Sequence, residues 1–472
     1  MTNWKEVVQA NQTQLIADLK DLIAVVSVRD DSRAADGAPL GPGPRDGLLK
    51  FGEFAKRDGF EFHNLANLVG YVEYAPESAD DQYIALLAHV DEMPAGDGWT
   101  TDAFTAVEKN GRLYGRGSSD DKGPALAAYH ALKTVRDLAL PLKHKVRFIL
   151  GTDEENDWTC MDYYFKHEPA PLLGFSPDAE FPIINGEKGL AQYEIHFQGS
   201  NAGDVRLLKF QAGERTNMVP GKAIATIQTA APSKVSQDFQ IFLSQHTVLS
   251  GQAAIDGQQI SLTVNGKQAH GAWPEDGENA GTYLADFLSQ YSFKESAAAF
   301  LSYLGGIAHQ DPKGSQLGIA SHDDLMGDLS MNVGIMRFQQ DTDSYINLNV
   351  RFPKSTSNAA ILKGLNSTRP VGISAEFANK GFAQAPHYVP ADDPMVKSLL
   401  RIYEEQTGQK GHEQVIGGGT YGRLMKRGVG YGALFPQRES TMHQANEYIE
   451  IDDLKLADSI YAQAIYELAN LD

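Results

Sequence analysis

A histidine and an aspartate, His89 and Asp91, stand at the end of the apolar run formed by residues 83–88. Residues two apart on a strand point to the same face, and strand ends in α/β folds open onto the ligand crevice. A carboxylate beside an imidazole can orient the ring and raise its basicity toward a metal ion. A histidine near an aspartate is also common on protein surfaces, so this pair alone indicates a metal site only weakly.

Two acidic motifs follow. Residues 115–123, Gly-Arg-Gly-Ser-Ser-Asp-Asp-Lys-Gly, place Asp120 and Asp121 ahead of an Ala-rich stretch. Paired aspartates there are typical of a helix cap, whereas the glycines permit tight turns that bring a carboxylate into a crevice. Residues 151–155, Gly-Thr-Asp-Glu-Glu, follow a second apolar run. Three adjacent acids are costly unless a positive charge lies nearby, so the alternatives are a solvated turn and a metal site with a general base.

An aspartate and a distant histidine complete the set. Asp178 lies in Phe-Ser-Pro-Asp-Ala-Glu-Phe-Pro, residues 175–182, and His443 begins His-Gln-Ala-Asn-Glu-Tyr. None of these motifs is specific alone. Together they supply two imidazoles and several carboxylates without a thiolate, and such mixed nitrogen and oxygen ligands suit Zn²⁺, Mn²⁺ or Co²⁺.

The elements that would position these residues alternate between strand and helix. Residues 83–89 and 145–150 are continuous apolar runs of strand length, typical of strands covered on both faces. A Gly-, Pro- and Asp-rich stretch, residues 30–46, is expected to be a loop. Helices are expected at residues 15–26, 48–57 and 124–138. This alternation indicates an α/β layer structure.

From about Lys188 the apolar residues recur with period two, which is typical of antiparallel strands with one wet face. Such strands are expected at residues 191–197, 260–264 and 345–350, with helices near 279–291 and 359–366. Strong helix patterns return at 394–407 and 454–471. We therefore expect residues 188–381 to be a second domain, inserted into a first domain formed by residues 1–187 and 382–472.

Composition narrows the possible partners and location. The chain has 61 acidic and 41 basic residues, a formal charge of -20, which argues against nucleic acid and anionic membranes as partners. It has no run of eighteen apolar residues, and its first residues lack the apolar region of a signal peptide, so a cytoplasmic location is expected. The single cysteine, Cys160, cannot form an intrachain disulfide and is interpreted as structural, because no partner residues form a nucleophile signature with it.

As an ordered set from His89 to His443, the five motifs resemble the co-catalytic metallopeptidase family of aminoacylases, succinyl-diaminopimelate desuccinylase, carnosinase and bacterial dipeptidases. The likeness is greatest to the peptidase V type of bacterial dipeptidase, because of residues 115–123, 151–155 and 175–182 and the large inserted domain. The resemblance implies an α/β fold, a mixed-sheet zinc-peptidase catalytic domain with an inserted α+β lid domain.

The resemblance also implies a ligand set for two divalent metal ions, with Zn²⁺ expected first and Mn²⁺ or Co²⁺ as alternatives. Asp120 would bridge the two ions. His89 and Asp178 would complete one site, and Glu155 and His443 would complete the other.

The same family pattern assigns the catalytic residues of the metal domain. Glu154 would be the general base that deprotonates a metal-bridging water and passes the proton to the leaving amine. Asp91 would orient His89 from behind. The peptide bond between Asp120 and Asp121 would be cis.

In the inserted domain, the resemblance assigns residues that would hold the substrate. His270 would stabilise the tetrahedral oxyanion. Asn217 and Arg351 match the lid motifs that bind the substrate's C-terminal carboxylate, with Arg351 as the bidentate anchor. Gly417 and Gly418, in a Gly-rich turn, would contact the same carboxylate through their backbone.

The sequence therefore predicts a metallo-dipeptidase that hydrolyses dipeptides with a free N-terminus and a C-terminal carboxylate. The alternatives are an N-acyl-amino-acid deacylase or desuccinylase of the same family and a non-catalytic binding module, against which the presence of Glu154 argues. The expected partner is a small peptide substrate, with no obligate protein partner. A monomer is expected because the inserted domain is longer than the dimerising domain of many relatives and carries two sets of strand and helix patterns, before and after about Gln310.

Overall fold

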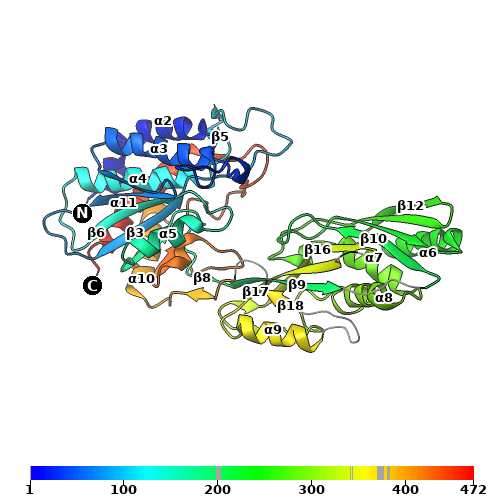
Figure 1. Cartoon of the computed structure of the whole chain (residues 1–472). Helices are drawn as coiled ribbons and strands as arrows, with labels where there is room; N and C mark the ends of the chain where they lie inside the picture. Colours follow the sequence, from blue (N-terminus) through cyan, green and yellow to red (C-terminus); the bar gives the residue numbers. More distant parts are fainter. Residues whose placement is uncertain are drawn as a thin grey trace. The chain divides into compact units, whose positions relative to one another are not determined.

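A computed structural model describes residues 2–197, 203–340, 342, 344–368, 377–379 and 383–471. The chain divides into two compact units, both of which mix helices and strands (Figure 1). Unit 1 comprises Met1–Gly186, Tyr388–Val415 and Gly419–Asp472, and unit 2 comprises Glu187–His387 and Ile416–Gly418. The predicted α/β class is confirmed. The predicted boundary between Gly381 and Phe382 lies outside the described residues, and the predicted domain limits stay a prediction.

The described residues of unit 1 contain a six-stranded mixed sheet in the order β1-β2-β6-β3-β7-β21. The strands are β1 (Phe62–Leu65), β2 (Val69–Tyr74), β6 (Lys145–Gly151), β3 (Tyr83–His89), β7 (Leu173–Ser176) and β21 (Gly428–Gly430). β3 pairs in parallel with β6 on one side and β7 on the other. The carboxyl ends of these three strands therefore meet at one edge of the sheet. Three predicted metal ligands lie there, because His89 ends β3, Glu155 follows β6 and Asp178 follows β7.

Helices cover both faces of this sheet. They are α2 (Gln12–Ile23), α3 (Pro42–Arg57), α4 (Lys122–Asp137), α5 (Thr159–His167), α10 (Pro394–Thr407) and α11 (Ile451–Leu468). Every residue of β3 is buried. Ile84, Leu86 and Ala88 belong to the core that includes α2, α3, α4, α10 and α11, whereas Ala85 and Leu87 belong to the core that includes α5. The unbroken apolar run of β3 is thus explained by burial on both faces, as predicted.

Most helices of unit 1 lie where the sequence predicts, with one clear error. The stretch 30–46, predicted to be a loop, contains a 3₁₀ turn at Asp31–Arg33, and α3 already begins at Pro42. Proline is well suited to the first turn of a helix, because its φ is fixed in the helical range and its missing N–H needs no partner there. The smaller elements of unit 1 are α1 (Trp4–Val7), η1 (Val8–Ala10), β4 (Val107–Lys109), β5 (Arg112–Tyr114), η5 (Tyr421–Leu424) and β22 (Tyr448–Glu450).

The described residues of unit 2 form an eight-stranded antiparallel sheet in the order β12-β13-β11-β10-β16-β17-β9-β18. The strands are β9 (Gly189–Phe197), β10 (Arg206–Ala212), β11 (Lys222–Gln228), β12 (Ser250–Asp256), β13 (Gln259–Asn265), β16 (Ser330–Gln339), β17 (Ser344–Phe352) and β18 (Phe377–Asn379). Its core is completed by α6 (Pro232–Gln245), α7 (Ala280–Ser289), α8 (Glu295–Ser302) and α9 (Asn358–Ser367). The short elements are η3 (Pro274–Asp276), a π-helical turn η4 (Tyr303–Ile307), β14 (His322–Asp323) and β15 (Gly327–Asp328).

One expectation for unit 2 needs correction. The strand predicted at 345–350 with one wet face is β17, and all of its residues except Tyr345 are buried. The alternation of polar and apolar residues is real, but the polar residues Asn347, Asn349 and Arg351 are buried as well. The strands before and after Gln310 belong to one sheet, because β16 pairs with β10 and β17 pairs with β9.

Three two-residue strands lie where the chain passes between the units: β8 (Gly186–Glu187), β19 (His387–Tyr388) and β20 (Val415–Ile416). In the part of the chain that the structure describes, no helix is both long enough and apolar enough to cross a membrane.

Candidate metal centre

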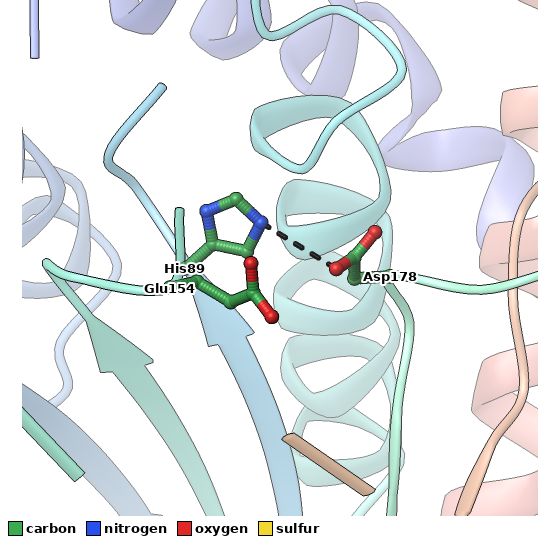
Figure 2. A group of neighbouring side chains, drawn as sticks. All are labelled: His89, Glu154 and Asp178. Carbon is green, nitrogen blue, oxygen red and sulfur yellow. Dashed lines mark ion pairs between the residues drawn. The ribbon is translucent and has the colours of Figure 1, made fainter. Parts of the chain in front are cut away.

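The predicted ligands of unit 1 converge at the edge where β3, β6 and β7 end. His89 is the last residue of β3 and is fully buried. Its Nε2 atom lies 3.1 Å from Asp120 Oδ1 and 3.6 Å from Asp178 Oδ2. Figure 2 shows His89, Glu154 and Asp178 converging from three separate segments of the chain. Parallel pairing of the three strands therefore brings together residues that are far apart in sequence.

His443 approaches the same place from the C-terminal part of unit 1. Its Nε2 atom lies 2.8 Å from Asp120 Oδ2 and 3.0 Å from Glu155 Oε1. The two carboxylate oxygens of Asp120 thus face two different histidines, His89 on one side and His443 on the other. A carboxylate held in this way has the geometry of a ligand shared between two ions.

Two groups of side chains in the described residues could each hold a metal ion. One consists of His89, Glu154 and Asp178, and the other of Asp120, Glu155 and His443; in each group the ligand atoms lie within 4.8 Å of one another. Both groups contain imidazole and carboxylate donors, which suit divalent ions such as Zn²⁺, Mn²⁺ and Co²⁺. Four carboxylates lie with only two imidazoles, so divalent cations would also balance the negative charge of this site.

The electrostatics reflect this excess of carboxylates. Burial raises the pKa of Asp120, but hydrogen bonds with His443 and His89 outweigh it and hold that pKa below its ordinary value. Burial raises the pKa of Glu155 to about 7, helped by the charge of Asp120. Burial likewise raises the pKa of Glu154 well above its usual range. Burial lowers the pKa of His443, but its hydrogen bonds to Asp120 and Glu155 raise it to about 11.

Asp91 has contacts that the sequence did not predict. His89 Nδ1 lies 3.0 Å from the backbone oxygen of Asp91 and 3.5 Å from its carboxylate. The carboxylate accepts hydrogen bonds from the backbone N–H groups of Glu154, at 3.0 Å, and Glu155, at 3.1 Å. Asp91 therefore fixes the segment that carries two of the acidic residues as well as lying beside the imidazole.

Asp121, which was not among the predicted site residues, also braces the centre. Its Oδ2 atom accepts a hydrogen bond of 3.0 Å from the backbone N–H of His89. The peptide bond between Asp120 and Asp121 is cis, as the family resemblance predicted. Next to it, Lys122 and Glu92 form a fully buried ion pair at 2.7 Å. The loop that carries Asp120 is thus tied to the segment that follows β3.

The predicted catalytic residue His270 and the predicted substrate-binding residues Asn217, Arg351, Gly417 and Gly418 all belong to unit 2. The backbone N–H of Gly271 donates to the backbone oxygen of Asn217 at 2.7 Å. A Cβ atom at Gly271 would lie 2.9 Å from that oxygen, so this close approach requires glycine. The loop of His270 therefore packs directly on the loop of Asn217.

Arg351 and Gly417 lie together in the same unit. The guanidinium Nη1 of Arg351 donates to the backbone oxygen of Gly417, and its Nε donates to Asn349 at 3.2 Å. A Cβ atom at Gly417 would lie 3.1 Å from the side chain of Ala272, two residues after His270. Arg351 thus contacts Gly417 directly, and the loops of His270 and Asn217 contact each other through Gly271. Gly418 adjoins Gly417 in sequence.

Cys160 lies in α5 and is buried in the core that includes Ala85 and Leu87 of β3. Its Sγ atom lies 3.0 Å from the hydroxyl of Tyr421, and burial raises the pKa of its thiol to about 12. A buried, protonated thiol is a poor nucleophile, in agreement with a structural role.

The amino-acid sequence is similar to those of known peptidases. Residues 85–467 match the family described as Peptidase family M20/M25/M40. A protein of Lactobacillus delbrueckii subsp. lactis named Beta-Ala-Xaa dipeptidase is 43% identical over 468 residues, which cover 99% of this chain and 98% of that protein.

Solved structures share the fold at low sequence identity. Human carnosine dipeptidase 1 has a TM-score of 0.58 and 15% identity, with 100% of both chains covered. Aminoacylhistidine dipeptidase from Vibrio alginolyticus has a TM-score of 0.53 and 15% identity, covering 95% of this chain and 96% of that chain.

Proposed function

The chain belongs to peptidase family M20/M25/M40, and we propose that this peptide-bond hydrolase acts on dipeptides with a free N-terminus and a C-terminal carboxylate. The observation that carries the proposal is the pair of ligand groups joined through Asp120. The full-length similarity to a protein named Beta-Ala-Xaa dipeptidase supports dipeptides as the substrate class.

Five residues would hold two ions, for which we propose Zn²⁺, with Mn²⁺ and Co²⁺ as alternatives. Asp120 would be shared between the ions, His89 and Asp178 would complete one site, and Glu155 and His443 the other. When bound, such a pair acts as a Lewis acid and lowers the pKa of the attacking water.

Glu154 would be the general base. Its side chain lies with His89 and Asp178 in one ligand group. His89, Asp178, Asp120, Glu155 and His443 would already supply enough donors for two ions, so Glu154 is not needed as a ligand. The Glu154 carboxylate would take a proton from the attacking water and pass it to the leaving amine. Asp91 would keep Glu154 in place through the hydrogen bond from its backbone N–H.

The residues of unit 2 would bind the substrate around the scissile bond. The Arg351 guanidinium, next to Gly417 and Gly418, would pair with the C-terminal carboxylate, together with Asn217. His270 would donate to the oxygen that becomes negative in the transition state. Recognition of both substrate ends would restrict length, because binding energy at remote groups positions the scissile bond.

The competing activity is hydrolysis of N-acyl-amino acids, which needs the same metal residues but no free amine. A screen of metal-reconstituted protein against dipeptides, tripeptides, and acetyl- and succinyl-amino acids tests the proposal. We expect amino acid release from dipeptides, none after chelation, and recovery with Zn²⁺, Mn²⁺ or Co²⁺. Faster release from acylated amino acids would establish the competing activity, and full activity of metal-free protein would refute the metal mechanism. Membership of a peptidase family, together with Glu154, favours an enzyme over a non-catalytic binding module.

A further inference from the structure

Glu447 is a buried carboxylate four residues after His443, and none of the roles above includes it. Its Oε1 atom accepts hydrogen bonds from the backbone N–H of Ser119 at 2.9 Å, the hydroxyl of Ser119 at 3.0 Å and the backbone N–H of Asp120 at 3.2 Å. Its Oε2 atom accepts from Arg116 Nη1 at 2.6 Å. One carboxylate thus fixes the backbone of the residue that faces both histidines.

The partner of Glu447, Arg116, extends the same network. Arg116 is 1% exposed, and its Nη2 atom donates to the backbone oxygens of Pro94 and Ala95 at 3.2 and 3.3 Å. Its guanidinium lies over the ring of Trp99, 5.5 Å from the ring centroid. The Arg116–Glu447 pair therefore joins the segment after β3 to the loop of Asp120.

Glu447 also ends the loop that carries His443. The backbone oxygen of Glu447 accepts from the N–H of Gly115 at 3.0 Å, just before β22 pairs with β5. The N–H of Tyr448 donates to the hydroxyl of Thr441 at 3.1 Å, which closes the loop of residues 441–448 around His443. The position of Glu447 is therefore set by the same short loop as that of His443.

We propose that Glu447 is a positioning residue of the metal centre, which holds the Asp120 loop and the His443 loop in register so that the two oxygens of Asp120 face His89 and His443. The inference rests on the proposed metal site. This role requires a carboxylate, because a neutral side chain cannot accept the three hydrogen bonds from Ser119 and Asp120 and also pair with the Arg116 guanidinium. Removing it would let the Asp120 loop shift relative to His443, which weakens binding of both ions together.

The test compares Glu447→Gln with Glu450→Gln in the full chain. Glu450 lies three residues further on and pairs with Arg112 at 2.8 Å, but it has no bond to the Asp120 loop, so it is a matched control. Binding of Zn²⁺ and Co²⁺ is measured by chelator competition, and the Co²⁺ absorption spectrum reports the ligand geometry. Ser119→Ala, which removes one donor to Glu447, is a milder variant in case Glu447→Gln does not fold.

We expect Glu447→Gln to weaken metal binding by about 10- to 100-fold and to change the Co²⁺ spectrum, with Glu450→Gln like the parent and Ser119→Ala in between. At saturating metal, kcat should fall while KM changes little, because the substrate-binding residues are untouched. Parent-like metal affinity and spectrum in Glu447→Gln, or in Ser119→Ala if the first variant does not fold, would overturn the proposal. Since metal binding is read without substrate, failure of the dipeptidase assay alone would refute the proposed function and leave this inference standing.

Discussion

Among the single residues of the centre, Glu154 and His89 are close neighbours with different expected roles. We expect Glu154→Ala to retain two bound metals while kcat falls by about 10²–10⁴-fold or more, because the variant loses the base and keeps five ligands. His89→Ala should lose metal as well as activity. Metal content measured on both purified variants checks this. Loss of one ion from Glu154→Ala would make Glu154 a ligand instead.

Arg351 offers a second residue-level prediction. Because its guanidinium lies beside Gly417 and would pair with the substrate carboxylate, Arg351→Lys should raise KM for dipeptides by about 10- to 100-fold, the value of a hydrogen bond to a charged group. Kinetics with dipeptides and with the matching dipeptide amides, which lack the carboxylate, provide the measurement and its control. An equal effect on both substrates would show that Arg351 does not recognise the carboxylate.

The sequence was more informative about which residues gather than about how they are held. His89, Asp178 and His443 could be picked out because each stands in a distinct motif, and the structure brings them to one edge of a sheet. The contacts of Asp91 with the backbone N–H groups of Glu154 and Glu155 could not be predicted from the sequence, since they depend on the path of a loop. Glu447 lies in the motif that begins at His443, but it bonds to Ser119 and Asp120, more than 300 residues earlier in the chain. Such a contact cannot be predicted from the spacing of residues within a motif.

At the scale of elements, strand patterns were informative where burial was simple. The run of β3 predicted a strand covered on both faces, and it is one. The alternation in β17 predicted a wet face that is in fact buried. Its polar side chains have partners there: Arg351 donates to Asn349 at 3.2 Å, and Asn347 donates to Glu194 at 3.4 Å. Proline-rich composition likewise concealed the start of α3. Periodicity shows which face is polar, whereas neighbours decide whether that face is exposed.

The stability of the packing between α2, α3 and α4 should depend on pH, because Asp18 of α2 bonds to Arg57 of α3 and to His130 of α4. This carboxylate, 1% exposed, accepts from Arg57 at 2.6 and 2.8 Å, and its contact with His130 Nε2 is 3.0 Å. Burial raises the pKa of Asp18, but these hydrogen bonds, Arg57 first, lower it below the ordinary value. A lowered folded pKa contributes stability above the unfolded pKa, and that stability is lost as pH falls through the folded value.

We therefore expect Asp18→Asn to lower the free energy of unfolding at pH 7 by about 3 kcal/mol. This is the lower end of the cost of removing one partner from a buried ion pair, because Arg57 is partly exposed. The difference from the parent should shrink as pH falls below about 4. Urea denaturation of the metal-free chain measures it. Asp137→Asn, which breaks surface ion pairs with Lys133 and Arg136 on α4, is the control and should cost less than about 1 kcal/mol. A pH-independent difference would contradict the assignment.

For the whole molecule, we propose a monomer in which His270 acts on the metal centre of its own chain. The alternative is a dimer that exchanges this histidine. His270→Ala and Glu154→Ala should each be inactive, and mixing them should restore nothing if the site is formed within one chain. Activity regained on mixing would show that His270 acts across subunits. A single-chain mass in solution, with specific activity independent of protein concentration, would agree with the monomer.

Unit 1 is built from segments on both sides of unit 2, and this order has a consequence during synthesis of the chain. His89, Asp120, Glu154, Glu155 and Asp178 are synthesised before Glu187–His387, whereas His443 and Glu447 are synthesised after it. Until then the nascent chain carries these carboxylates with one imidazole, and it lacks the hydrogen bonds that Ser119 and Asp120 give to Glu447. The complete set of predicted metal ligands can therefore come together only after unit 2 has been synthesised.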